Sequence, residues 1–295
     1  MGLNCSETLK HISMYYRTLT HPHGFFMTNE QANLGFVRIS KCGSTSAVNT
    51  LHLKNWMSFE RQHEVSRIFC CLRNPHERFL SSIFETINRA KFQGKLYGSV
   101  IVSPIILNRL STIDQSSPKT ITHDFIKIIE DHGFFDAHHE PMTNFLCNRH
   151  GEIEIDPQVF DVSDMTDVLK QLTENNHSSP STHFNSSDQK AEKINAEHRT
   201  SIYQVFKKIV RKGMNKMRPP QQQQKRDSGQ FVNLDKQRIN IPYQSLKEMK
   251  NDPILNDFIQ EFYPNDIKLH HALMGEKAKK KHVTLEHLPN LSDLI

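Results

Sequence analysis

The chain has 295 residues with a formal net charge of +5 at neutral pH, and 36% of its residues are hydrophobic. This length suits one large α/β domain or two small ones, and the low hydrophobic content predicts that part of the chain is loop. The mild basicity excludes a strongly acidic protein and suits an anionic ligand, without choosing between nucleotide, nucleic acid and acidic polysaccharide.

The first half of the chain alternates short apolar strands with amphipathic helices. Residues 36–39 and 68–72 are apolar runs of strand length, and helical patterns follow them at 45–53 and 76–92. This order is that of a βαβ unit, which predicts parallel strands and a right-handed crossover. We therefore expect a P-loop-like three-layer α/β fold, in which helices flank a central parallel sheet.

The second half of the chain is less regular. Its predicted elements are a helix over 122–130 capped by Thr120 or Thr122, a strand over 159–162, a helix from Ser163 to about Leu172 and a helix over 253–262. Residues 175–235 read as a variable or partly disordered insertion, with a basic helical pattern at 191–213 and a glutamine-rich linker at 218–230. The charged residues 277–295 are predicted to form a mobile tail of a single domain over 1–295.

The turn after the first strand carries donors that suit phosphate. Lys41 supplies a point charge, Gly43 permits close approach of a phosphate, and Ser44, Thr45 and Ser46 open the next helix. This is not a Walker A motif, because the lysine precedes the glycine and no Ser or Thr follows the lysine to hold magnesium. A small-molecule kinase is therefore disfavoured, although it stays an alternative.

The segment after the second strand carries further phosphate ligands. Arg73 leaves the end of the strand and offers a bidentate guanidinium, and Ser81 adds a hydroxyl two turns into the next helix. Glu77 and Arg78 favour a structural ion pair. Since each segment follows a strand, we interpret the two as halves of one nucleotide site.

These segments resemble those of a known enzyme family. Residues 38–46, Arg-Ile-Ser-Lys-Cys-Gly-Ser-Thr-Ser, resemble the 5′-phosphosulfate loop of the carbohydrate sulfotransferases, and residues 72–81, Leu-Arg-Asn-Pro-His-Glu-Arg-Phe-Leu-Ser, resemble their 3′-phosphate segment. The chain is most similar to the heparan sulfate 2-O- and chondroitin enzymes. Residues 136–141 and 258–269 are weaker matches to two other motifs of the family.

The resemblance implies transfer of a sulfuryl group from 3′-phosphoadenosine 5′-phosphosulfate (PAPS) to a hydroxyl, without a metal. The residues that would grip the 5′-phosphosulfate are Arg38, Lys41, Gly43, Ser44, Thr45 and Ser46. Arg73 and Ser81 would hold the 3′-phosphate, and Lys41 would also neutralise charge on the bridging oxygen. Ser40 departs from the family's proline before the lysine, without removing a ligand group.

The acceptor hydroxyl also needs a general base, for which His or Glu is expected. Resemblance to the heparan sulfate 2-O-enzyme favours a histidine shortly before the second strand, hence His63. The other candidates are His52, Glu60, Glu64, His138 and His139. A metal centre formed by residues 136–141 with Cys147 and His150 is disfavoured, because the spacings do not match a zinc site.

The sequence thus predicts a PAPS-dependent sulfotransferase whose acceptor is a glycan or another small hydroxyl compound. The alternative outside enzymes is a sulfotransferase-like module that binds an anionic glycan or nucleotide without turnover. The basic stretch at 207–218 is interpreted as a solvent-exposed helix face, and the alternative is a binding surface for an anionic acceptor. Nucleic acid is not expected as a partner, because no aromatic platform accompanies these charges.

The cysteines and the apolar runs of the sequence indicate the cellular compartment of the protein. The five cysteines include no close CxxC pair, which favours a reduced, cytoplasmic location. The apolar runs are too short to cross a bilayer and the N-terminus lacks the apolar core of a signal peptide, so no transmembrane segment is expected. A Golgi lumenal domain lacking its anchor is the alternative, and residues 1–6 also fit an N-myristoylation pattern with a cysteine for palmitoylation.

Overall fold

The computed structural model describes residues 3–9, 11, 23–94, 96–97, 103–176, 248–279 and 283–295. These residues belong to one unit, which is formed by residues 1–178 and 237–295. The predicted insertion lies outside the described residues from residue 177 on, together with the basic helical pattern and the linker that it contains.

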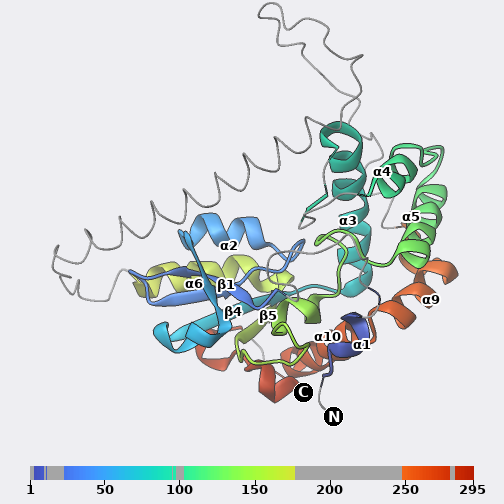
Figure 1. Ribbon diagram of the computed structural model, residues 1–295. Helices are drawn as coiled ribbons and strands as arrows, with labels where there is room; N and C mark the ends of the chain where they lie inside the picture. Colours follow the sequence, from blue (N-terminus) through green and yellow to red (C-terminus); the bar gives the residue numbers. More distant parts are fainter. Residues whose placement is uncertain are drawn as a thin grey trace, which may run out of the picture. The chain divides into compact units, whose positions relative to one another are not determined.

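A five-stranded mixed sheet forms the centre of this unit (Figure 1). In spatial order its strands are β3 (Asn55–Ser58), β1 (Phe25–Asn29), β2 (Leu34–Val37), β4 (Arg67–Leu72) and β5 (Gln158–Asp161). β2, β4 and β5 are parallel, whereas β1 pairs antiparallel with both β2 and β3. The predicted α/β class is confirmed, but the predicted wholly parallel sheet is corrected to a mixed one.

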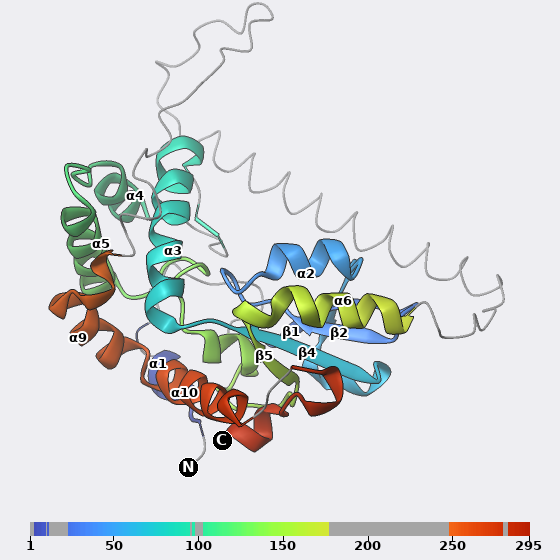
Figure 2. The same cartoon turned by 180° about the vertical axis from the view of Figure 1, so that it is seen from behind.

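Helices cover both faces of the sheet. The described helices are α1 (Ser6–Leu9), α2 (Ser44–Thr50), α3 (Pro75–Asn88), α4 (Pro104–Ser111), α5 (Pro118–His132), α6 (Met165–Asn176), α9 (Pro253–Phe262) and α10 (Pro264–Ala278), of which α4, α5 and α9 pack on one another beside the sheet (Figures 1 and 2). α2 and α6 lie together on one face and α10 packs on the other (Figures 1 and 2). Within the described ranges, no helix combines the length and the apolar character needed to cross a bilayer.

Short helical turns complete the chain. The 3₁₀ turns are η1 (Phe59–Glu64), η3 (Met142–Leu146), η4 (Val162–Asp164), η5 (Glu248–Asn251), η6 (Leu285–His287) and η7 (Leu291–Leu294). A π-helical turn, η2 (Arg89–Gln93), continues α3. The predicted helix over 76–92 is therefore present, but its last turn is wider than an α-helical one.

Side-chain caps set where the helices begin. The Asn74 side chain accepts hydrogen bonds from the backbone N–H groups of His76 and Glu77, so α3 begins at Pro75. α5 begins four residues before the predicted 122–130, because Ser117 rather than a threonine caps it. A cap satisfies N–H groups that the first helical turn leaves unpaired.

Residues 283–295 pack against the sheet. The backbone N–H of Val159 in β5 donates to the carbonyl of Pro289 at 2.8 Å, and Leu285 and Leu291 are buried in the core. The structure therefore differs here from the predicted mobile tail. The prediction followed the charged residues, but the leucines spaced among them supply the apolar surface that holds the segment in place.

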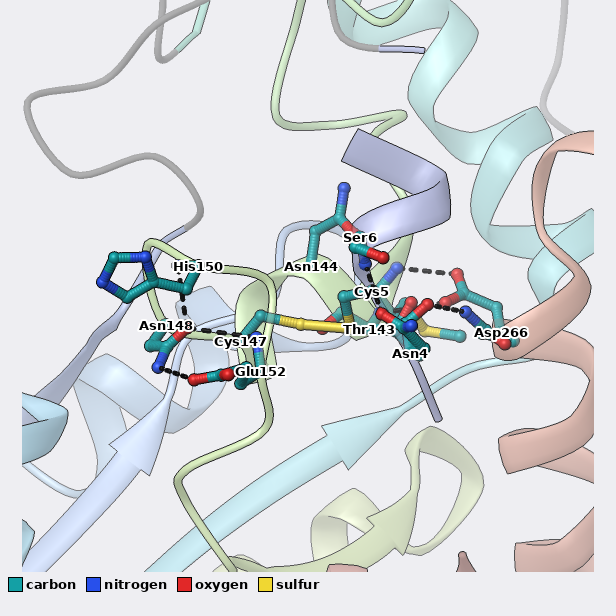
Figure 3. The surroundings of a disulfide bond; sticks show 12 residues. Asn4, Cys5, Ser6, Thr143, Asn144, Cys147, Asn148, His150, Glu152 and Asp266 are labelled. Atoms are coloured by element: carbon teal, nitrogen blue, oxygen red, sulfur yellow. Dashed lines mark hydrogen bonds between the residues drawn. A yellow bond between two sulfur atoms is a disulfide. The ribbon is translucent and has the colours of Figure 1, made fainter. Parts of the chain in front are cut away.

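A disulfide joins Cys5 to Cys147, which are 142 residues apart in the sequence (Figure 3). It connects the start of α1 to the end of η3, and beside it the Asn265 side chain donates to the carbonyl of Asn4 at 3.1 Å. The remaining cysteines are free and buried: Cys42, Cys70 and Cys71. Disulfides persist in oxidising compartments, so this bond stands against the reduced compartment expected from the cysteine spacing.

Candidate functional site

The two predicted phosphate segments meet at one pocket of about 320 Å³, at the edge of the sheet where the parallel strands β2 and β4 end. Its lining residues are Arg38, Ser40, Lys41, Gly43, Ser44, Thr45, Ser46, Arg73, Ser81, Glu85, Arg89, Tyr97 and His138. All the residues predicted to bind the donor are in this set. Ligands of open α/β sheets bind at this edge, beyond the carboxyl ends of the strands.

The loop between β2 and α2 has a tightly curved backbone. Lys41 and Gly43 have φ angles of 66° and 70°, in the left-handed region. The positive φ of Gly43 favours glycine, and a Cβ atom there would also require the end of the Met165 side chain, at the start of α6, to move. The positive φ of Lys41 is unfavourable for a residue with a side chain, and such conformations concentrate at ligand sites.

Glu85 brings two cations of the pocket together. Its carboxylate lies 3.7 Å from Nζ of Lys41 and 2.7 Å from Nε of Arg89. Burial lowers the pKa of Lys41 below its usual value, and the nearby Glu85 offsets part of that shift. Burial raises the pKa of Glu85, but Lys41 and Arg89 outweigh it, so this pKa lies below its usual value and Glu85 is ionised at neutral pH.

Arg73 links the two phosphate segments directly. Its guanidinium donates to the backbone carbonyl of Lys41 at 3.4 Å, and its Nε lies 3.7 Å from the Glu77 carboxylate. Glu77, which the sequence paired with Arg78, therefore contacts Arg73 instead. Both segments thus present their cations to the same pocket.

Arg78 joins the phosphate loop to the turn at 136–140. The side chain is only 1% exposed, and it donates three hydrogen bonds to backbone carbonyls. Nε donates to Ser40 at 2.9 Å, and the two terminal nitrogens donate to Glu140 at 2.5 Å and to Ala137 at 3.4 Å. The predicted structural role of Arg78 is therefore correct, but an ion pair is not what carries it.

His138 reaches the pocket from this turn. Its Nδ1 lies 2.6 Å from the carboxylate of buried Asp136, which also accepts the backbone N–H of Tyr97 at 2.5 Å. Burial raises the pKa of Asp136, but the hydrogen bond and charge of His138 outweigh it, and this pKa lies below its usual value. An ionised Asp136 favours the tautomer with the proton on Nδ1, which leaves Nε2 as an acceptor.

The structure does not bring His63 to the pocket. His63 is exposed in η1, which precedes β4, whereas Arg73 follows β4. A strand of six residues spans about 20 Å, so the two residues lie at opposite edges of the sheet. The expectation of His63 as the base is therefore corrected.

The remaining base candidates also lie outside the lining. They are His52, Glu60, Glu64 and His139. His139 is fully buried among the rings of Phe125, Phe134 and Phe135, and burial lowers its pKa to about 3. The disfavoured metal cluster does not form either, because Cys147 is in the disulfide.

Sequence reasoning missed three lining residues, Glu85, Arg89 and Tyr97. Glu85 lies one helical turn after Ser81, so the i, i+4 spacing places the two on the same face of α3. That spacing could have predicted Glu85 as a lining residue. Tyr97 carried no such signal, because it lies beyond the helix that bears the second segment.

Comparison of the chain with protein-family models, curated proteins and solved structures found no match. The resemblance to the sulfotransferases therefore rests on the residues of the two segments. Another hollow, about 710 Å³ beside residues 151–156, contains none of the predicted site residues.

Proposed function

We propose that the chain is a PAPS-dependent sulfotransferase that acts on a hydroxyl group, with a carbohydrate as the acceptor. One observation carries this proposal. The two segments that resemble a 5′-phosphosulfate loop and a 3′-phosphate segment line a single pocket. A donor with phosphate groups at the 3′ and 5′ positions of its ribose needs two cationic sites in one cavity. Arg38, Lys41 and Arg73 supply the cations.

In the proposed reaction the acceptor oxygen forms a bond to sulfur while the bond from sulfur to the bridging oxygen breaks. The electron pair of that bond leaves with the 5′-phosphate of the product PAP. Lys41 would donate to the bridging oxygen as its charge grows, and the hydroxyls of Ser44, Thr45 and Ser46 would hold the other oxygens. Fixed donors aimed at developing charge are the main source of catalysis in such transfers.

The hydroxyl proton would pass to Nε2 of His138. This histidine lines the pocket and Asp136 orients its ring, which is the arrangement that keeps a histidine ready as a base. Glu85 also lines the pocket, but Lys41 and Arg89 stabilise its ionised form and reduce its basicity. We therefore assign the base to His138 rather than to Glu85.

We infer the compartment from the disulfide. A bond between Cys5 and Cys147 is expected to persist in an oxidising compartment, so we favour the lumenal alternative over the cytoplasmic location. In this state Cys5 is also not available for palmitoylation.

The donor site is tested by isothermal calorimetry with PAP. The wild-type protein should bind PAP, and Lys41→Ala and Arg73→Ala should each weaken binding roughly tenfold to a hundredfold, as expected for the loss of one charge-assisted hydrogen bond. Lys54→Ala is the matched control, because Lys54 is exposed and outside the pocket. No PAP binding by the wild-type protein, or magnesium-dependent ATP binding instead, would refute the proposal.

The chemistry is tested with labelled PAPS and a panel of glycans and small hydroxyl compounds. His138→Asn should lower turnover by roughly 10²–10⁴ with PAP affinity retained, whereas His63→Asn should change neither. Metal chelators should have no effect. PAP binding without transfer to any acceptor would support the binding module instead.

A further inference from the structure

Four residues of the pocket lie outside the two phosphate segments. Glu85, Arg89, Tyr97 and His138, here called the acceptor wall, face the same cavity as the donor-binding residues. Resting on the proposed function, we propose that Glu85 determines acceptor specificity and that this wall selects a neutral polyhydroxyl compound, such as a neutral sugar, over an acidic one.

The first argument is the state of Arg89. An arginine in an acceptor site would ordinarily be taken as a receptor for a carboxylate or sulfate. Here its Nε already lies 2.7 Å from Glu85, and its guanidinium lies 5.4 Å from the ring centre of Tyr97. Its charge and one face are thus already engaged by the wall itself. An acidic acceptor would have to compete with Glu85 for Arg89.

The second argument is the charge of the pocket once the donor is bound. The cations of the described lining are Arg38, Lys41, Arg73 and Arg89, and its one carboxylate is Glu85. PAPS brings roughly four negative charges, of which about two belong to the 3′-phosphate. The four cations therefore equal the donor charges in number, so Glu85 leaves the lining with a net negative charge once the donor is bound.

The size of the effect follows from Coulomb's law. A negative charge on the acceptor some 6 Å from Glu85, at the effective dielectric constant of about 20 near a protein surface, weakens binding by roughly a hundredfold. Arg89 and Lys41 beside Glu85, together with water and salt, reduce this figure, so a discrimination of roughly tenfold is expected, with a hundredfold as the upper bound. A neutral sugar is not subject to this repulsion.

The third argument is what the wall offers to a neutral ligand. The half-buried ring of Tyr97 lies 5.0 Å from the ring of His138, beside the proposed base. An aromatic face suits the C–H face of a sugar ring, while the Glu85 carboxylate can accept a hydrogen bond from a hydroxyl. These groups place a hydroxyl near Nε2 of His138 without requiring any charge on the acceptor.

The experiment measures initial rates with labelled PAPS on matched acceptor pairs: methyl glucoside and methyl glucuronide, and methyl galactoside and methyl galacturonide. The readout is the ratio of kcat/KM for the neutral member to that for the acidic one, in which any effect on donor binding cancels. The wild-type protein should favour the neutral member roughly tenfold, with a hundredfold as the upper bound.

Two variants should move this ratio in opposite directions. Glu85→Gln removes the repulsion and releases Arg89, so the ratio should fall about tenfold. Arg89→Gln leaves Glu85 less compensated, so the ratio should rise. A merely structural role of the pair would lower both rates together and leave the ratio unchanged.

Glu77→Gln is the matched control. Glu77 lies on the same helix as Glu85 and has the same side-chain exposure of 37%, but it is outside the pocket. Its substitution should leave the ratio unchanged. A wild-type preference for the acidic members, an unchanged ratio in Glu85→Gln, or transfer to no sugar despite PAP binding would each overturn the inference. Absence of PAP binding would instead overturn the proposed function, and this inference with it.

Discussion

His139 is a buried neutral histidine, and its replacement by leucine should make the protein more resistant to acid. The side chain is fully buried against three phenylalanine rings, and neither ring nitrogen has a hydrogen-bond partner in the structure. Burial lowers its pKa from the usual 6.5 to about 3, although nearby Asp136 opposes part of the shift. Leucine has nearly the volume of histidine and needs no partner, so the core should accept it.

The sign and the size follow from proton linkage. Below pH 6.5 the unfolded chain binds a proton at His139, whereas the folded chain does not until about pH 3. The unfolded state therefore binds more protons throughout this window, and stability falls as the pH drops through it. One pH unit corresponds to about 1.4 kcal/mol, so this residue alone should reduce the free energy of unfolding by about 2 kcal/mol between pH 7 and pH 5.

Urea unfolding followed by circular dichroism at pH 7 and pH 5 measures this difference. The wild-type protein should lose about 2 kcal/mol more than His139→Leu on acidification, because the variant lacks the group that takes up the proton. The control His63→Gln removes an exposed histidine and should behave as the wild type. Equal losses in wild type and His139→Leu, within the error of the extrapolation, would refute the reasoning.

Three further predictions test the framework of the site. The first is an alkylation of the denatured protein, read by intact mass. Three of the five cysteines should be modified without reductant, and all five should be modified after reduction. Modification of all five without reductant would rule out the disulfide. Arg78→Lys retains the charge, but the lysine cannot reach three carbonyls at once. Urea unfolding should therefore show that the free energy of unfolding falls by about 3 kcal/mol, and an unchanged midpoint would contradict these contacts. Asp136→Asn should lower turnover by roughly 10²–10⁴ in the labelled-PAPS assay and leave PAP affinity intact in calorimetry; equal loss of both would mean that Asp136 supports the fold instead.

The strands that the sequence predicted are those with continuous apolar runs. β4 is within one residue of the predicted 68–72 because both its faces are covered, so every residue of the run is apolar after the first. β3 was not predicted because it is an edge strand. Only Met57 of β3 is buried, while Trp56 is 52% exposed, and one buried position gives no alternating pattern in the sequence. β1 joins β2 through a tight turn that ends at Asn33, with φ of 51°, and asparagine tolerates that conformation better than most residues.

The pocket residues of the two phosphate segments could be predicted because their signals are local. Lys41 and Arg73 each follow a strand and precede a helix, and parallel neighbouring strands place such residues at one edge of the sheet. The base could not be found in this way. His63 is close to β4 in sequence, but it precedes the strand, and strand direction puts it at the other edge. The position of His138 depends on hydrogen bonds from Arg78 across 59 and 62 residues, which no local pattern encodes.

The turn that carries His138 is held by Arg78 and also by elements outside the two predicted phosphate segments. The carboxylate of Asp266 in α10 accepts the backbone N–H groups of Met142 and Thr143 at 2.6 and 2.9 Å, and the Tyr263 hydroxyl donates to the carbonyl of His139. The disulfide then fixes the end of η3, as Figure 3 shows beside Asp266.

In the proposed reaction, donor binding and proton transfer would consequently depend on different parts of the chain. The residues proposed to bind the donor lie in the loops after β2 and β4, at the start of α2 and in α3, so their positions follow from the sheet. The position of the base follows from α10 and the disulfide, and Arg78 connects the two halves. Loss of the disulfide should therefore loosen the half that holds His138 before the half that binds PAP. In Cys5→Ser this reasoning requires kcat to fall while the Kd for PAP stays near that of the wild type.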